Sequence, residues 1–201
     1  VVNRTNRSFM DLVPEGWFRM YLDKMVEMNN EMPLAFHFLS CAVAMGNGLG
    51  FNNWIRINRG VSVYPNVNVI LFSPAGECRR GEGTKLAMKV AQLGGIRVLE
   101  GRLTPEGLLD ELSDIEKEMG CGNLLLYVEE LSTLLNKRDY QQHIIPLLTK
   151  LMLNTGMPVR ERTRGGGKKE VAKVNLSCLF TTAPDWFLTS IPQEAYGGGM
   201  M

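Results

Sequence analysis

Three apolar strand candidates, separated by helical segments, constrain the fold of this chain more than any other feature of its sequence. They cover residues 67–72, 123–131 and 171–184, and the first two contain nearly continuous runs of apolar side chains. A strand with apolar side chains on both faces is buried on both, as in a parallel sheet with helices on either side. The sequence therefore predicts an α/β fold with a mainly parallel sheet.

Helical patterns fill most of the chain before and between these strands. Residues 15–28 carry apolar side chains at helical spacing, and Pro33 opens a second helix, which we expect to end near Ala44, before the glycines at 46, 48 and 50. Thr104 and Pro105 start another helix, which runs to about Met119. Further helices are expected over residues 83–93, 130–135, 140–153 and 185–190, and further short strands over 54–57 and 96–99.

The composition fits one globular core. Of the 201 residues 45% are hydrophobic, and 22 basic residues stand against 21 acidic ones, which argues against a disordered chain and against a global attraction to nucleic acid. Four widely spaced cysteines and only two histidines favour reduced thiols in a cytoplasmic protein over disulfides or a structural zinc site. The apolar residues 34–45 are shorter than the roughly 20 residues that span a bilayer, so no membrane contact is expected.

The turn after the first strand carries the strongest chemical signal. In SPAGECRRGEGTKLA a glycine-rich turn and a helix start follow the first strand. In this order the backbone N–H groups of the turn and the positive end of the helix dipole can bind a phosphate. Gly76 and Gly81 satisfy the first part of the P-loop pattern GxxxxGK(S/T), but Glu82 stands where the lysine belongs. Three nearby cations could replace that lysine: Arg79, Arg80 and Lys85. The alternative is an ordinary strand-to-helix connection with solvated charges.

Two further polar groups follow strands of the predicted sheet. Glu129 and Glu130 end the second apolar strand, where P-loop ATPases carry the carboxylates that organise Mg²⁺ and polarise the attacking water. Such a pair is also ordinary charge placement at a helix start. Thr181 and Thr182 end the third strand, where either hydroxyl could sense a γ-phosphate if this strand neighbours the one that carries Glu129; threonine is also common in strands for packing reasons.

A basic segment follows the predicted helix over residues 140–153. Residues 156–173 hold six basic and two acidic side chains, a net charge of +4, and we expect a flexible loop there. Such a loop can bind a nucleic-acid backbone or can simply be solvated. Its basic residues are Arg160, Arg162, Arg164, Lys168, Lys169 and Lys173. His37 and His143 lie in predicted helices without a complementary nucleophile, and no catalytic role is expected for them.

The order of these segments resembles a family of phage and plasmid replication ATPases, which often form the helicase-like part of primase-helicase proteins. The resemblance is carried by VYPNVNVILFSPAGECRRG, GRLTPEGLLDEL, LLLYVEELSTLL and VNLSCLFTTAPDWFLTSI, with the closing GGG, and it runs from about Trp17 to the end of the chain. The family's loop commonly contains an arginine-lysine pair. Here the pair is Arg79-Arg80 and the loop is a few residues longer.

The resemblance implies a three-layer, RecA-like P-loop core over residues 61–201 with a helical lead-in over residues 1–60. It also implies binding of ATP and Mg²⁺, assembly into a homo-oligomeric ring, and work on single-stranded DNA in the host cytoplasm. Because the chain begins with Val1 and ends in a Gly-Gly-Gly-Met-Met run, we expect it to be part of a longer polypeptide.

The family pattern also assigns roles to individual residues. Glu130, Glu129 and Arg80 are the expected catalytic residues, Thr84 and Glu129 the Mg²⁺ ligands, and Thr181 and Thr182 the sensors. The expected nucleotide-binding residues are Gly76, Arg79, Arg80, Gly81, Gly83, Thr84 and Lys85. Glu82 favours an alternative from another class, a non-hydrolysing scaffold or DNA-binding module, and a DNA-packaging ATPase would share the same core.

Overall fold

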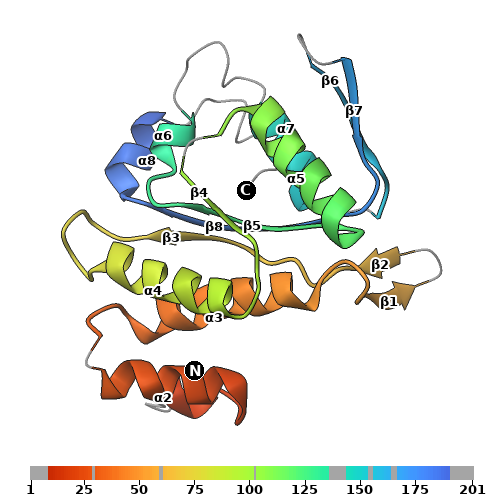
Figure 1. Ribbon diagram of the computed structural model, residues 1–201. Helices are drawn as coiled ribbons and strands as arrows, with labels where there is room; N and C mark the ends of the chain where they lie inside the picture. Colours follow the sequence, from red (N-terminus) through yellow and green to blue (C-terminus); the bar gives the residue numbers. More distant parts are fainter. Residues whose placement is uncertain are drawn as a thin grey trace.

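A parallel sheet of four strands lies at the centre of the chain, as the apolar segments predict. The computed structural model describes residues 9–28, 30–58, 61–101, 103–135, 144–153, 156–163 and 167–190. In the sheet the strands follow the order β3-β8-β5-β4, and every neighbouring pair is parallel (Figure 1). The strands are β3 (Asn68–Phe72), β4 (Val98–Glu100), β5 (Gly122–Val128) and β8 (Val174–Thr182). The α/β class with a parallel sheet is therefore confirmed.

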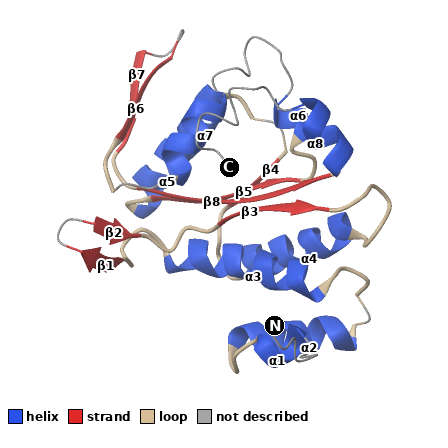
Figure 2. Cartoon of the chain, turned by 180° about the vertical axis from the view of Figure 1, so that it is seen from behind, coloured by secondary structure: helices blue, strands red, loops and turns tan. Residues whose placement is uncertain are grey.

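Helices cover both faces of this sheet, because the side chains that its central strands point toward each face are apolar. Leu124 and Leu126 of β5 pack on one face, and Leu125 and Tyr127 pack on the other. One face is covered by α5 (Pro105–Met119) and α7 (Ile144–Met152), and the other by α3 (Leu34–Leu49) and α4 (Arg80–Leu93) (Figures 1 and 2). An outer helix, α2 (Trp17–Glu27), lies against α3. The short helices are α1 (Phe9–Leu12), α6 (Ser132–Leu135) and α8 (Pro184–Ser190).

Helix α3 continues past the point where its glycines were expected to end it. It runs to Leu49, so that Gly46 and Gly48 lie inside it. A Cβ atom on Gly46 would lie 2.2 Å from the carbonyl oxygen of Pro65, which means that the missing side chain lets the chain leading into β3 cross the helix at close range. Beside it, Asn47 donates hydrogen bonds to the carbonyl oxygens of Leu124 (2.8 Å) and Asn175 (3.2 Å). Gly46 therefore serves close packing, and of the three glycines expected to end the helix Gly50 does so, as its C-cap with a φ of 74°.

The basic segment is a two-stranded antiparallel ribbon where a flexible loop was expected. Strand β6 (Val159–Thr163) pairs with β7 (Gly167–Val171), and the prediction of a loop was wrong for these residues. Val159 and Val171 are buried in the same apolar core as α5 and α7, so the ribbon is anchored at its base. A second ribbon, β1 (Ile55–Asn58) with β2 (Val61–Val63), lies on the same side of the molecule (Figure 1).

A buried histidine joins α2 to α3. The hydroxyl of Tyr21 lies 3.3 Å from Nδ1 of His37, and Nε2 of His37 lies 3.0 Å from Oδ1 of Asn30. Burial lowers the pKa of His37 to about 4, so the ring is neutral at ordinary pH. His143 lies outside the described residues.

Two further properties of the chain concern its cysteines and its helices. All four cysteines are free, and Cys178 is buried in the sheet. Within the described part of the chain, no helix combines the length and the apolar character needed to cross a membrane.

Two glycines of α3 provide a matched test of the close crossing. We expect Gly46→Ala to destabilise the fold by about 2 to 3 kcal/mol, because the new methyl group overlaps a backbone oxygen that cannot move alone. Gly48→Ala should be neutral or stabilise by about 0.5 to 1 kcal/mol, because its methyl group meets only the Ile96 side chain at 3.4 Å. Urea denaturation of both variants measures the difference, and equal effects would contradict the crossing.

The His37 network predicts a pH dependence of stability. The ring has a pKa of about 4 in the folded chain and an ordinary value of 6.5 when unfolded, so the unfolded chain takes up a proton first as the pH falls. Stability is fully present above pH 6.5 and declines toward pH 4, by up to about 3 kcal/mol from this residue. The measurement is urea denaturation from pH 8 to 4 with His37→Gln as reference. The difference between the two proteins should shrink over that window, and a constant difference would refute the assignment.

Candidate functional site

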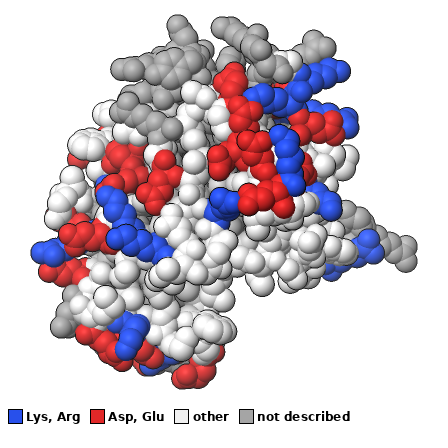
Figure 3. Space-filling model, in the orientation of Figure 1, with Lys and Arg blue, Asp and Glu red and all other residues white. Residues whose placement is uncertain are grey.

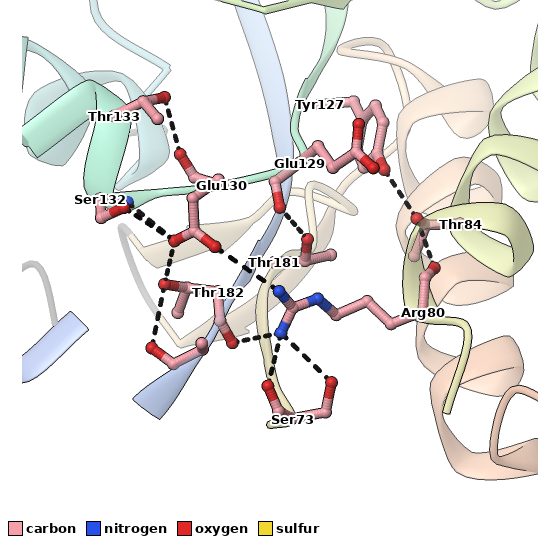
Figure 4. A network of polar contacts seen from close by, with 11 residues as sticks. Ser73, Arg80, Thr84, Tyr127, Glu129, Glu130, Ser132, Thr133, Thr181 and Thr182 are labelled. Atoms are coloured by element: carbon pink, nitrogen blue, oxygen red, sulfur yellow. Dashed lines mark hydrogen bonds and ion pairs between the residues drawn. The ribbon is translucent and has the colours of Figure 1, made fainter. Parts of the chain in front are cut away.

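The carboxyl ends of three adjacent strands bring polar side chains together at one edge of the sheet. Ser73 follows β3, Thr182 ends β8, and Glu129 and Glu130 follow β5 (Figure 4). Strand β8 pairs with both β3 and β5, so the threonines lie beside the strand of the glutamates, the condition on which their predicted role depended. In open α/β sheets this edge is the usual place for ligands.

Arg80 connects all three strand ends. It is the first residue of α4, which begins a few residues before the predicted start near residue 83. Its Nη1 donates hydrogen bonds to the carbonyl oxygens of Ser73 (2.7 Å) and Thr182 (2.5 Å) and to the Ser73 hydroxyl (3.2 Å). Its Nη2 lies 3.5 Å from Oε2 of Glu130, and the side chains of both partners are mostly buried, 13% and 15% exposed.

The carboxylate of Glu130 is held from several sides. Its Oε1 accepts hydrogen bonds from the backbone N–H of Ser132 (3.3 Å), from the Ser132 hydroxyl (2.9 Å) and from the hydroxyl of Thr182. The hydroxyl of Thr181 donates instead to the backbone carbonyl of Glu129. Both predicted sensor residues therefore bind the acidic segment directly, and Ser132 is a further member of the site that the sequence patterns did not indicate.

Glu129 lies against the first turn of α4. Its Oε2 lies 2.8 Å from Nζ of Lys85, and both side chains are about half exposed. A Cβ atom on Gly81 would lie 2.6 Å from Oε1 of Glu129. The carboxylate thus occupies space that is open only because residue 81 has no side chain.

Thr84 lies inside the structure. It is fully buried, and its hydroxyl donates to the carbonyl oxygen of Arg80 (2.8 Å) and lies 2.7 Å from the hydroxyl of Tyr127. Burial is the main cause that raises the pKa of Tyr127 to about 12. The pair ties α4 to β5, and sequence patterns singled out only Thr84 because Tyr127 reads as one more apolar residue of its strand.

The rest of the predicted phosphate-binding turn has an unusual backbone. Gly76, Cys78 and Arg79 all have positive φ angles, of 79°, 63° and 40°. The Arg79 guanidinium is exposed and lies 2.8 Å from the carboxylate of Glu31 and 3.7 Å from that of Glu82. Gly83 packs on Met32, whose Sδ would lie 2.5 Å from a Cβ atom there. Of the three candidate cations, Arg80 therefore lies at the strand ends, and Lys85 lies beside them, against Glu129. Arg79 pairs with a different set of carboxylates.

Of the predicted DNA-binding cations, Arg160, Arg162, Lys168 and Lys169 belong to the β6–β7 ribbon, which lies toward the opposite edge of the sheet (Figures 1 and 2), and Lys173 follows it in the turn before β8. Arg160 pairs with Glu170 at 2.9 Å, and Lys169 pairs with Asp110 of α5. Figure 3 shows acidic and basic side chains intermixed on this part of the surface. Lys168 and Lys173 are exposed. The side chains of Arg162 and Arg164 lie outside the described part.

A groove of about 1020 Å³ lies elsewhere, between α2, α3 and α4. Trp17 and Met20 of α2 and Val90 of α4 are among its mainly apolar lining residues, and none of the strand-end residues described above lines it. Among the described residues, no three His, Cys, Asp or Glu side chains gather as a metal site.

Comparison with known proteins does not assign the chain to a family. It matches no family model, and no curated protein matches it.

The two cation–carboxylate pairs should differ in strength because they differ in burial. In a double-mutant cycle of Arg80→Met with Glu130→Gln we expect a coupling of about 1 to 3 kcal/mol. The matched cycle of Lys85→Met with Glu129→Gln should give less than about 1 kcal/mol, because water screens that pair. Chemical denaturation provides both values, and a stronger coupling for the exposed pair would contradict the described geometry.

Proposed function

We propose that this chain is a nucleoside-triphosphatase domain with a RecA-like P-loop core, which binds ATP and Mg²⁺ at the carboxyl ends of β3, β8 and β5. The single observation that carries the proposal is the position of Arg80. A mostly buried guanidinium at the first residue of a helix, directly after a strand and a glycine-containing turn, contacts two neighbouring strand ends and a carboxylate. Such a helix start is where proteins bind phosphate groups.

Arg80 is the best candidate for the cation that replaces the P-loop lysine. A guanidinium can bind two phosphate oxygens at once, which a lysine ammonium does with less directional control. Lys85 supplies a second cation at the border of the same site, 2.8 Å from Glu129. Arg79 is engaged with Glu31 and contributes less directly.

The charges of the site favour a nucleotide accompanied by a metal ion. Arg80 and Lys85 are each paired with a carboxylate, those of Glu130 and Glu129. A triphosphate that drew both cations away would leave two carboxylates beside its own negative charge. Carboxylate and phosphate oxygens are the ligands that Mg²⁺ prefers, so Mg²⁺ between them offsets this repulsion.

The remaining residues have roles that follow from their contacts. Glu130 would orient the attacking water, since its carboxylate is fixed by Ser132 and Thr182 and reaches the strand ends. Arg80 would stabilise charge on the transferred phosphate. Thr182, which binds both Glu130 and Arg80, would report on the state of the phosphate.

We further propose that the domain is the motor of a phage or plasmid replicative helicase, which acts on single-stranded DNA as a homo-oligomeric ring. This part rests on the sequence resemblance and on two exposed cations, Lys168 of the β6–β7 ribbon and Lys173 just after it. The ion pairs of Arg160 and Lys169 leave these two as the clearest candidates for a backbone contact among the described residues.

A second candidate is a non-hydrolysing scaffold or DNA-binding module built on the same core. The observation that favours it is the engagement of every candidate cation, because Arg79, Arg80 and Lys85 all pair with glutamates. In such a protein these contacts would be permanent and would serve stability alone.

Nucleotide binding and turnover test the proposal. We expect ATP to bind in calorimetry with Mg²⁺ present, and we expect Glu130→Gln to keep that binding while losing about 100-fold or more in turnover, the usual loss of a general base. The matched control is Glu111→Gln, an exposed glutamate of α5 that should change neither quantity.

The two candidates separate in a turnover assay with and without single-stranded DNA. Stimulation by DNA supports a motor, and binding without turnover in either condition supports the scaffold. Absence of ATP binding to the folded protein would refute the proposed function.

A further inference from the structure

We propose that the Glu129 carboxylate, which reaches across Gly81, binds Mg²⁺ in place of the serine or threonine hydroxyl that P-loop nucleoside triphosphatases use as a ligand. The inference rests on the proposed function and deepens it, because it concerns how this chain would hold the metal. Gly81 and Glu129 then act as a pair: the missing side chain of Gly81 leaves room for the Glu129 carboxylate, and this carboxylate supplies the metal ligand that Gly81 lacks.

The first step concerns position in the chain. In the P-loop pattern the hydroxyl residue directly follows the cation, at the start of the helix. Arg80 is the first residue of α4 and is the cation that reaches the strand ends. The residue that follows it is Gly81, which has no side chain with which to bind a metal.

The second step concerns the space that this glycine leaves. Oε1 of Glu129 lies 2.6 Å and its Cδ atom 3.6 Å from the point where a Cβ atom of residue 81 would be. These distances are too short for a side chain and the carboxylate to coexist there without a shift. The carboxylate oxygen therefore lies beside the point where the hydroxyl-bearing side chain of a P-loop would begin.

The third step excludes the other hydroxyl of this segment. Thr84 is fully buried, and its hydroxyl is engaged by the carbonyl oxygen of Arg80 and by the hydroxyl of Tyr127. To serve as a ligand it would have to break both contacts inside the core. Glu129 is about half exposed and needs only to leave Lys85, an exchange that a phosphate drawing on the same lysine favours.

The pairing predicts a reciprocal dependence. A serine at position 81 would push the Glu129 carboxylate aside, and an aspartate at position 129 would be one methylene too short to reach across Gly81. A protein with both changes has a hydroxyl beside the cation, as in the P-loop pattern, and a shorter acid at the end of β5. We therefore expect the two changes to compensate each other.

A double-mutant cycle on the purified chain tests this dependence. The measured quantity is the ratio of the ATP dissociation constants without and with Mg²⁺, from calorimetry in EDTA and in magnesium chloride. We expect Gly81→Ser and Glu129→Asp each to lower that ratio by about tenfold, equivalent to about 1.4 kcal/mol, and the double variant to restore it to within about threefold of the original chain. Thermal unfolding of all four proteins shows whether each one folds.

A matched control is Gly48→Ser, a helical glycine of α3 whose added side chain meets only Ile96. It should leave the ratio unchanged. Recovery in the double variant supports the inference. If the original chain binds ATP with Mg²⁺ but the double variant is as impaired as the two single changes combined, the inference is wrong and the proposed function stands. If the folded original chain binds no ATP, the proposed function itself fails.

Discussion

Strand β8 is the element on which the arrangement of this protein depends. All nine of its residues are buried, and it pairs with β3 on one edge and with β5 on the other. Polar side chains on a strand enclosed in this way need partners, because a buried polar group without a hydrogen bond is costly; among the described residues of the strand, only Oδ1 of Asn175 is buried without one. At its carboxyl end Thr181 and Thr182 find those partners on the acidic segment after β5. The packing of the sheet and the arrangement of the site therefore depend on the same buried strand.

The same edge also concentrates opposite charges. Arg80 and Glu130 are mostly buried together, and an ion pair with so little water must be supported by further hydrogen bonds to be tolerated. Ser73 and Thr182 supply them for the arginine, and Ser132 and Thr182 for the glutamate. Lys85 and Glu129 form a second, wetter pair beside it. The site is thus built from two balanced pairs that differ in how much water surrounds them.

Several features were predictable from local patterns because their causes are local. Thr104 accepts a hydrogen bond from the Gly107 N–H at 3.1 Å and begins α5 where the Thr-Pro pair predicted a helix start. The apolar runs became strands β3, β5 and β8. The failures arose where distant contacts decided the outcome. Gly46 lies inside α3 because Pro65 crosses there, and the basic segment forms a ribbon because Val159 and Val171 are buried against a core assembled from other elements.

By itself, the sequence determined the α/β class, the central strands and the segments that carry the candidate site, since periodicity and strand ends depend on neighbouring residues. It could not decide among Arg79, Arg80 and Lys85, which lie within seven positions of one another in the chain. Only the tertiary structure separated them, because the start of α4 and the order of the strands determine which cation meets Glu130. The tertiary structure likewise placed the Thr84 hydroxyl against Tyr127 and the Glu129 carboxylate over Gly81, since contacts across 43 and 48 positions leave no local trace in the sequence.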